Sequence, residues 1–207
     1  MNPHYFSDTD EARANERTPL EYRVRGIDFH VEVADQVFSS HRLDLGTKVL
    51  IDCAPPPPER GTFVDVGCGW GPISLALAHL SPEATVWAVD PNTRARDLTK
   101  RNARALGYRS VEVMSPENAK ARAEALVAAG GGVDLVWSNP PVRIGKAALR
   151  ELLTSWLGVL APEGEAWFVI AKNLGADSMT AWLCEQGWDA VKIQSKKGYR
   201  IIRVRRA

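Results

Sequence analysis

A glycine-rich segment at residues 65–71, DVGCGWG, is the first place where residue types and spacing favour ligand binding. It follows an apolar run, and Pro72 opens a helical pattern directly after it. Glycines there let the backbone turn tightly and approach a ligand closely, and Asp65 is placed to meet a cationic amino group. Because any tight strand-to-helix turn needs glycine for steric reasons, the segment indicates a binding site only together with its neighbours.

A second candidate, Asp90, ends the next predicted strand, 23 residues after Gly67. Its carboxylate can accept two hydrogen bonds from ribose hydroxyls. The run from Asp90 to Asn92 also suits helix capping, which is the commoner role of an acid at a strand end. The glycine-rich segment before it favours ribose binding.

The run Asn139-Pro140-Pro141 follows a predicted strand at 133–138. Prolines donate nothing to a strand ladder, so this run leaves the sheet; as ordinary structure it is a rigid strand exit. An exocyclic amine on a planar group has its lone pair delocalised and must be oriented before it reacts. The Asn139 side-chain oxygen and the Pro140 carbonyl can accept its N–H groups, which predicts catalysis by positioning and electrostatics.

Alternating strands and helices must position these motifs. Strands are predicted at 62–66, 85–90, 110–114, 133–138, 165–171, 189–195 and 199–206. Helices are predicted at about 71–80, 92–106, 117–129, 145–158 and 176–187. Strands joined through helices form parallel βαβ units, whereas the last two, joined across 196–198, pair antiparallel. The sequence predicts an α/β fold with a mixed, doubly wound sheet.

Four prolines at 55–58 separate this core from an amino-terminal extension. Alternating apolar and polar residues on both sides of Gly26 predict a β-hairpin, and a helix is predicted to begin between Asp44 and Thr47. We expect a single domain over residues 1–207. Residues 1–58 would extend over the substrate and cofactor side of a core at 59–207.

Composition narrows the class of protein. The chain has 207 residues, of which 45% are hydrophobic and 25% charged, which suits one globular domain. Its start does not have the pattern of a secretory signal, and no apolar stretch is long enough to span a membrane. The three cysteines lack metal-site spacing. We expect a cytoplasmic, metal-free protein with no membrane partner, and the oligomeric state, monomer included, is left open.

The net charge of +1 conceals a basic carboxyl-terminal segment. Residues 192–207 hold seven Lys or Arg residues and no acidic residue. Such side chains keep an edge strand from aggregating. They also suit contact with the phosphates of a nucleic acid. Both interpretations stay open from the sequence.

Together, the glycine-rich segment, Asp90 and the order of elements from 61 to 207 resemble the class I S-adenosylmethionine-dependent methyltransferases. The run at 139–141 is similar to the N-P-P-x signature of those that act on planar amines. Further segments resemble single-domain relatives of the small-subunit rRNA guanine-N2 methyltransferases, the RsmC-like family. These segments are HYFS at 4–7, VFS at 37–39, LDLGT at 43–47, NPPVRIGK at 139–146 and KGY at 197–199.

The resemblance implies a Rossmann-like fold of seven strands and S-adenosylmethionine as cofactor. It implies methyl transfer to the exocyclic N2 of a guanine in 16S ribosomal RNA, with ribosomal RNA or a ribosomal subunit as partner. In that family the stretch matching Phe38 to Thr47 lies over the methionine end of the cofactor. The catalytic residues would be Asn139, Pro140 and Pro141. The cofactor-binding residues would be Asp44, Thr47, Asp65, Gly67, Cys68, Gly69, Gly71, Asp90, Pro91, Asn118 and Asn139. The substrate-binding residues would be Phe38, Val142, Arg143 and Lys146.

Two departures from the family pattern keep alternatives open. Val142 stands where many such enzymes have an aromatic residue that stacks on the target base. No acid stands at the end of the strand at 110–114 to meet the adenine amine, so Glu117 or Asn118 would do so unless they cap the next helix. The alternatives are a protein glutamine-amide or small-molecule N-methyltransferase, and a non-catalytic cofactor- or RNA-binding module.

Overall fold

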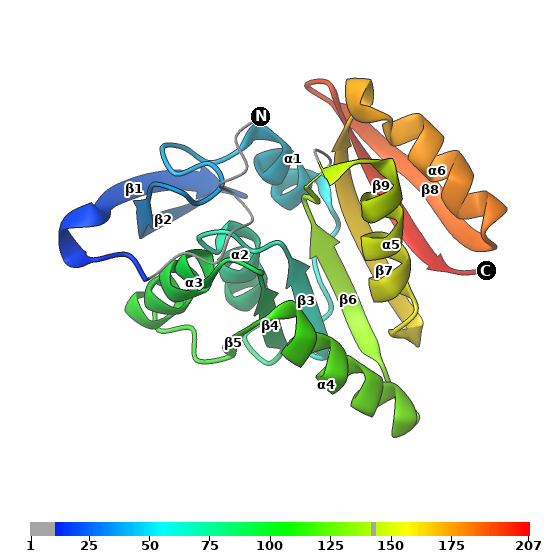
Figure 1. The fold of residues 1–207 in the computed structure, drawn as a ribbon, viewed down its shortest axis with the longest axis horizontal. Helices are drawn as coiled ribbons and strands as arrows, with labels where there is room; N and C mark the ends of the chain where they lie inside the picture. The colour runs from blue at the N-terminus through cyan, green and yellow to red at the C-terminus, as the bar shows by residue number, and fades with distance from the viewer. Residues whose placement is uncertain (1–10, 142–143) are drawn as a thin grey trace.

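The computed structural model describes residues 11–141 and 144–207. Its centre is a seven-stranded sheet in the order β5-β4-β3-β6-β7-β9-β8 (Figure 1). The strands are β3 (Thr62–Val66), β4 (Thr85–Val89), β5 (Val111–Met114), β6 (Val133–Ser138), β7 (Leu160–Ala171), β8 (Trp188–Lys196) and β9 (Tyr199–Arg206). The helices are α1 (Leu45–Cys53), α2 (Pro72–Leu80), α3 (Thr93–Ala105), α4 (Pro116–Ala128), α5 (Lys146–Leu157) and α6 (Ala176–Glu185). The predicted Rossmann-like, mixed seven-stranded sheet is confirmed.

Helices cover both faces of this sheet. Side chains of α1, α2 and α3 share one buried apolar cluster with the sheet, and those of α4, α5 and α6 share a second. Successive strand residues alternate between the two clusters, as Phe63 and Val64 do, because strand side chains point to opposite faces. The central strands are therefore apolar on both faces, which explains their nearly continuous hydrophobic runs.

The pairing of the strands brings several loops to one edge of the sheet. β3 pairs parallel with β4 and β6, and β6 pairs parallel with β7, so their carboxyl ends lie together. β9 runs antiparallel to β7 and β8, with Tyr199 opposite both Ala171 and Lys196. The turn between β8 and β9 therefore lies at the same edge as the carboxyl end of β7.

One strand boundary differs from its prediction by more than one residue. β7 begins at Leu160 rather than at residue 165, and Leu160 pairs with Val133. The register then shifts so that Leu135 pairs with Glu165. A proline and a glycine at 162 and 164 suggest a turn, but here they form a bulge inside the strand.

The amino-terminal extension packs on the α1–α3 face. The 3₁₀ turn η2 (Ala14–Glu16) leads into a separate antiparallel hairpin of β1 (Arg17–Val24) and β2 (Ile27–Ala34) (Figure 1). Apolar side chains of both strands and of α1 belong to the same cluster as α2 and α3. The predicted hairpin and helix are both present, and they share the core with the sheet.

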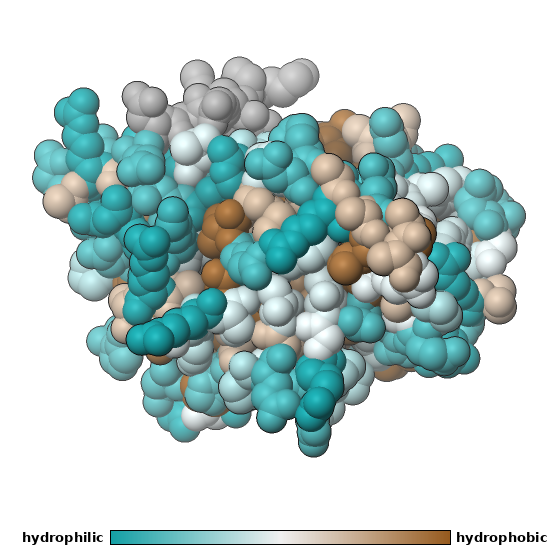
Figure 2. Space-filling model, turned by 90° about the horizontal axis from the view of Figure 1, so that it is seen from below, coloured by the Kyte–Doolittle hydropathy of each residue, from teal (hydrophilic) through white to brown (hydrophobic). Residues whose placement is uncertain are grey.

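The surface opposite the carboxyl ends of the parallel strands is shown in Figure 2. Hydrophilic side chains dominate it, with small apolar patches between them. Among the described residues, no helix has the length and apolar character needed to cross a membrane.

Candidate active site

A cleft lies at the carboxyl ends of β3 and β6, where the order of the sheet reverses direction. Open α/β sheets bind ligands at such a switch point. The space within the cleft is about 330 Å³, and it includes volume that is open to solvent. Its lining residues are Phe38, Ser39, Asp44, Thr47, Gly67, Cys68, Gly69, Trp70, Pro72, Ile73 and Asn139.

The glycine-rich loop between β3 and α2 forms one wall of the cleft. Gly67 and Gly69 have φ angles of +79° and +58°, in the left-handed region that favours glycine. A Cβ atom built on Gly67 would meet nothing within 4 Å, so backbone there borders open space. Thr99 of α3 donates to the Gly69 carbonyl at 2.8 Å and holds the loop from behind. The loop therefore presents bare backbone to a ligand.

Asp90 follows β4 and supports the same loop. One carboxylate oxygen accepts from the Gly69 N–H and the other from the Asn92 N–H, both at 2.9 Å. Burial raises the pKa of Asp90 above its ordinary value. Asp90 and Pro91 are not among the lining residues, and ribose binding by Asp90 stays a prediction.

Asp65 on β3 is fully buried beneath the loop. Its Oδ2 accepts from the Ser74 N–H at 2.9 Å and from the Ser74 hydroxyl at 2.6 Å. Its Oδ1 is buried without a hydrogen-bond partner among the described residues. Burial raises the pKa of Asp65 to about 7, against the opposing effect of the bonds from Ser74. Asp65 is not itself a lining residue, and its contact with a cationic donor stays a prediction.

Asn139 enters the cleft from the end of β6. Its Nδ2 donates to Asp44 Oδ2 at 2.8 Å and to Thr47 Oγ1 at 2.9 Å. Because a carboxylate only accepts, the atom facing Asp44 must be the NH₂, and the Oδ1 of Asn139 stays available as an acceptor. Asp44 also caps α1 by accepting from the Thr47 N–H at 2.9 Å. The start of α1 thus fixes which way the Asn139 amide points.

The segment between β2 and α1 lies over the glycine-rich loop. Trp70 of the loop donates through its indole N–H to the Ser39 carbonyl at 3.2 Å, and Asn92 donates to the Gln36 carbonyl at 3.0 Å. Phe38 lines the cleft and remains 55% exposed, although it is apolar. An exposed ring at the mouth of the cleft is suited to contact a flat ligand.

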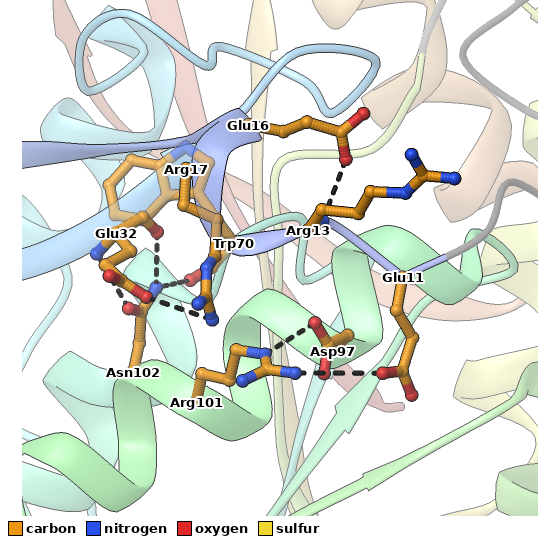
Figure 3. Close-up of polar contacts among 9 residues, drawn as sticks. All are labelled: Glu11, Arg13, Glu16, Arg17, Glu32, Trp70, Asp97, Arg101 and Asn102. Carbon is orange, nitrogen blue, oxygen red and sulfur yellow. Dashed lines mark hydrogen bonds and ion pairs between the residues drawn. The ribbon is translucent and has the colours of Figure 1, made fainter.

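A buried side chain of α3 joins the hairpin to this loop (Figure 3). Asn102 accepts from the Glu32 N–H at 2.8 Å and donates to the Glu32 carbonyl and the Trp70 carbonyl, both at 2.9 Å. The neighbouring Arg101 makes ion pairs with the largely buried Asp97 and the exposed Glu11 instead. Asn102 thus fixes β2 and the cleft wall relative to each other.

Some predicted site residues lie outside the cleft lining. Asn118 is exposed in the first turn of α4, whose cap is Ser115, and Lys146 is exposed at the start of α5. Val142 and Arg143 fall outside the described residues. Gly71, a predicted cofactor residue, opens α2 with φ +102° and packs on α3. The roles assigned to these residues stay predictions.

The remaining lining residues include several that the sequence motifs did not single out. Cys68, predicted to contact the cofactor and not to act as a nucleophile, is buried, and burial raises the pKa of its thiol well above the ordinary value. Pro72 and Ile73 were missed as lining residues, whereas Ser39 belongs to the stretch expected to lie over the cofactor. Asn102, with Thr99 one helical turn earlier, was missed as a support, although polar residues on the buried face of an amphipathic helix signal such a role.

Comparison with known proteins agrees with this geometry. A sequence model of the family described as the methyltransferase small domain matches residues 28–203. The uncharacterized protein YbxB of Bacillus subtilis is 33% identical over 206 residues, which is 100% of both chains. The ribosomal RNA large subunit methyltransferase G of Streptomyces coelicolor is 33% identical over 144 residues, covering 67% of this chain and 37% of that enzyme.

A solved structure shares the fold. The 16S rRNA N2 methyltransferase RsmC of T. thermophilus, in complex with AdoMet and guanosine, has a TM-score of 0.71 at 18% identity. The match covers 92% of this chain and 51% of that chain. This chain thus spans the whole of YbxB but about half or less of the two rRNA methyltransferases.

Two features in and beneath the cleft fit S-adenosylmethionine. Its methionine ammonium needs an anionic acceptor, and Asp65 holds a buried carboxylate oxygen without a partner. Its nucleoside needs close approach to backbone, and Gly67 leaves open space where a Cβ would stand. The family match extends over most of the chain. The chain therefore belongs to the methyltransferase small domain family, and S-adenosylmethionine is the methyl donor of its reaction.

Proposed function

We propose that this protein transfers the methyl group of S-adenosylmethionine to the exocyclic N2 of a guanine in 16S ribosomal RNA. The observation that carries the proposal is the fixed orientation of the Asn139 amide. Its NH₂ is held by Asp44 and Thr47. Its Oδ1, together with the Pro140 carbonyl, would then accept the N–H groups of the target amine.

This acceptor pair matches what an exocyclic amine needs. The nitrogen lone pair of guanine N2 is delocalised into the ring, and two acceptors on its N–H groups hold the nitrogen toward the incoming methyl group. The bound S-adenosylmethionine supplies an already activated methyl group on its sulfonium. The chain's own contribution is orientation: Asn139 and Pro140 direct the amine, and the start of α1 keeps Asn139 from rotating.

The cofactor side of the proposal uses the groups beneath and beside the glycine-rich loop. Asp65 would accept the methionine ammonium, and Asp90 would accept the ribose hydroxyls while it continues to hold the Gly69 N–H. The backbone at Gly67 and Gly69 would contact the nucleoside. In the domain as we propose it, residues 1–58 form an extension over this side of a core at 59–207.

The RNA side of the proposal draws on the relatives. Both rRNA methyltransferases described above act on RNA by name, one on the large subunit and one at N2 in 16S rRNA. We assign the present chain to guanine N2 of 16S rRNA, and its partner to ribosomal RNA or a ribosomal subunit in the cytoplasm. Phe38, Val142, Arg143 and Lys146 would contact the substrate, with the exposed Phe38 ring in the stacking role that Val142 cannot fill.

One labelling experiment tests the reaction, the substrate and the catalytic residue together. Isotopically labelled S-adenosylmethionine is incubated with the protein and undermethylated small subunits, large subunits or free rRNA, and the RNA is digested to nucleosides for mass spectrometry. We expect label in N2-methylguanosine from 16S rRNA, and loss of that label with Asn139→Ala.

The other outcomes each exclude part of the proposal. Label in 23S rRNA would move the target to the large subunit. No label in any RNA, with cofactor binding intact, would overturn the RNA assignment and direct the search to protein amides and small amines. If Asn139→Ala methylated RNA as well as the wild type, Asn139 would have no catalytic role.

A further inference from the structure

The basic side chains at the far end of the β8–β9 hairpin are already occupied by other groups of the protein. Arg203 and Arg205 donate to the Asp189 carboxylate at 3.1 and 2.6 Å. Arg206 donates to the Leu160 carbonyl at 2.8 Å. These arginines lie at the end of β9 that is remote from the cleft, where they stabilise the sheet edge. They fit the interpretation of the basic segment as edge protection.

The cleft end of the hairpin is different. Lys172, Lys196 and Lys197, which we call the lysine cluster, are exposed there. The Lys172 N–H donates to the Gly198 carbonyl at 2.8 Å, which ties the end of β7 to the β8–β9 turn and places the three lysines on adjoining backbone. Across residues 11–141 and 144–207, none of the three pairs with an acidic side chain. The Lys196 ammonium instead lies 3.5 Å from the Cys53 sulfur.

The backbone of the turn gives a second, independent observation. Lys197 and Gly198 form a two-residue turn with φ angles of +50° and +83°. Asparagine, aspartate and glycine are favoured at the first position of such a turn, and a lysine there is conformationally strained. Strained residues that persist on a surface are typical of functional positions. The turn therefore presents a lysine at a conformational cost.

The β8–β9 hairpin that carries the lysine cluster packs against α1, whose start borders the cleft. Tyr199, two residues after Lys197, lies against the first turn of α1: a Cβ atom on Gly46 would be 2.7 Å from its ring. The same turn carries Asp44, whose carboxylate holds the Asn139 amide. The Tyr199 ring thus joins the backbone next to Lys197 to the start of α1, whereas the Lys196 ammonium lies at the other end of that helix, beside Cys53.

We propose that the lysine cluster binds the phosphodiester backbone of the RNA next to the methylated base, and that the arginines at the far end of the hairpin do not. This inference rests on the RNA substrate proposed above. Unpaired, exposed ammonium groups can exchange their counterions for phosphates, whereas a guanidinium bound to Asp189 must first break an ion pair. The basic segment is thus divided into a structural end and an RNA-binding end.

Two double variants, each of which removes two positive charges, test the inference. Lys172→Gln with Lys197→Gln removes two unpaired charges of the cluster, and Arg205→Gln with Arg206→Gln removes two charges at the far end. Binding to transcribed 16S and 23S rRNA is measured from low to high salt for the wild type and both variants. S-adenosylmethionine affinity and thermal unfolding are measured in parallel as checks of the fold.

For the lysine variant, we expect the slope of log affinity against log salt to become shallower by about 1.4 to 1.8, the value for two lost phosphate contacts. Its cofactor affinity should equal that of the wild type. The arginine variant should keep the wild-type slope. A wild-type slope in the lysine variant, or a reduced slope only in the arginine variant, would overturn the inference and leave the methyl transfer untouched. A wild type that neither binds nor methylates RNA would overturn the proposed function itself.

Discussion

Asn139 and Asp44, which are 95 positions apart in the chain, meet in one hydrogen bond that joins the end of β6 to the start of α1. The Asp44 oxygen that accepts from Asn139 is also the oxygen that caps the helix. Local helix capping and orientation of the Asn139 amide therefore depend on the same atom. A change at Asp44 can remove one of these functions and keep the other.

Asp44→Ser is the substitution that separates the two functions. Serine caps a helix about as well as aspartate, but its shorter side chain does not reach Asn139. We expect single-turnover methyl transfer to slow by roughly tenfold to a hundredfold, since misplacement of a reacting group by about 1 Å has such an effect. Asp44→Asn keeps an oxygen at the same place and should retain most of the rate. Equal rates for Asp44→Ser and the wild type would show that Asn139 needs no support from α1.

The raised pKa of Asp65 predicts a pH dependence of cofactor binding. Its folded-state pKa of about 7 exceeds its ordinary value of 3.8, so without cofactor the fold favours the neutral acid, and this group's contribution to stability falls as pH rises between those values. An ammonium beside Asp65 favours the ionised form, so binding must release a proton. We therefore expect S-adenosylmethionine affinity to increase from about pH 5 to pH 7.

Calorimetry in two buffers of different ionisation enthalpy measures the released proton directly. Asp65→Asn cannot ionise and should lose both the proton release at this site and most of the pH dependence. Because burial also raises the pKa of Asp90, a smaller dependence of the same sign should remain in that variant. If S-adenosylmethionine affinity kept its full pH dependence in Asp65→Asn, the methionine ammonium would have to bind at another group.

Two glycines with nearly equal backbone angles allow a controlled test of the cleft wall. Gly67 and Gly107 have φ angles of +79° and +77°, and a Cβ on either would meet nothing within 4 Å. Alanine at each position therefore carries the same backbone strain, about 1–2 kcal/mol. Only Gly67→Ala places a methyl group in the cofactor cleft. We expect both variants to lose similar stability in urea unfolding, and only Gly67→Ala to lose S-adenosylmethionine affinity.

Asn102→Ala should destabilise the protein more than its size suggests. The substitution leaves the Glu32 N–H and the Glu32 and Trp70 carbonyls without their partner, and Asn102 is only 2% exposed. We expect a loss of about 2–4 kcal/mol in the free energy of unfolding, measured by urea titration. Arg101→Ala, on the same helix, removes ion pairs of a half-exposed guanidinium with Asp97 and Glu11 and should cost less stability than Asn102→Ala. Comparable losses in the two variants would contradict the proposed importance of the buried network.

The sequence predicted the fold well because its signals are local. Helical and strand periodicities set the elements of the sheet, and the absence of a helix between residues 196 and 198 required the last two strands to be antiparallel. The early start of β7 was missed, because the proline and glycine that suggest a turn form a bulge whose pairing depends on β6. Such a feature is decided by tertiary contact and has no short-range signature.

Only part of the site was predicted, because only part of it is encoded in local motifs. The glycine-rich loop, Asp44, Thr47 and Asn139 were found from motifs, and the structure brings them to one cleft. Asn102 was missed because its three partners come from β2 and from the loop, far from α3 in sequence. The side chains that line a cleft can be read from a motif, whereas those that brace it depend on packing between distant segments.

The shared bonds of Asn102 have a thermodynamic consequence. One side chain holds both the backbone of β2 and the loop that forms the cofactor wall, so displacement of the hairpin strains that wall. If a substrate that contacts the hairpin changes cofactor affinity by some factor, the cofactor must change substrate affinity by the same factor. Binding of the cofactor and binding of the substrate are then not independent events. Occupancy of the cleft by the demethylated cofactor would change the affinity of the protein for its methylated product.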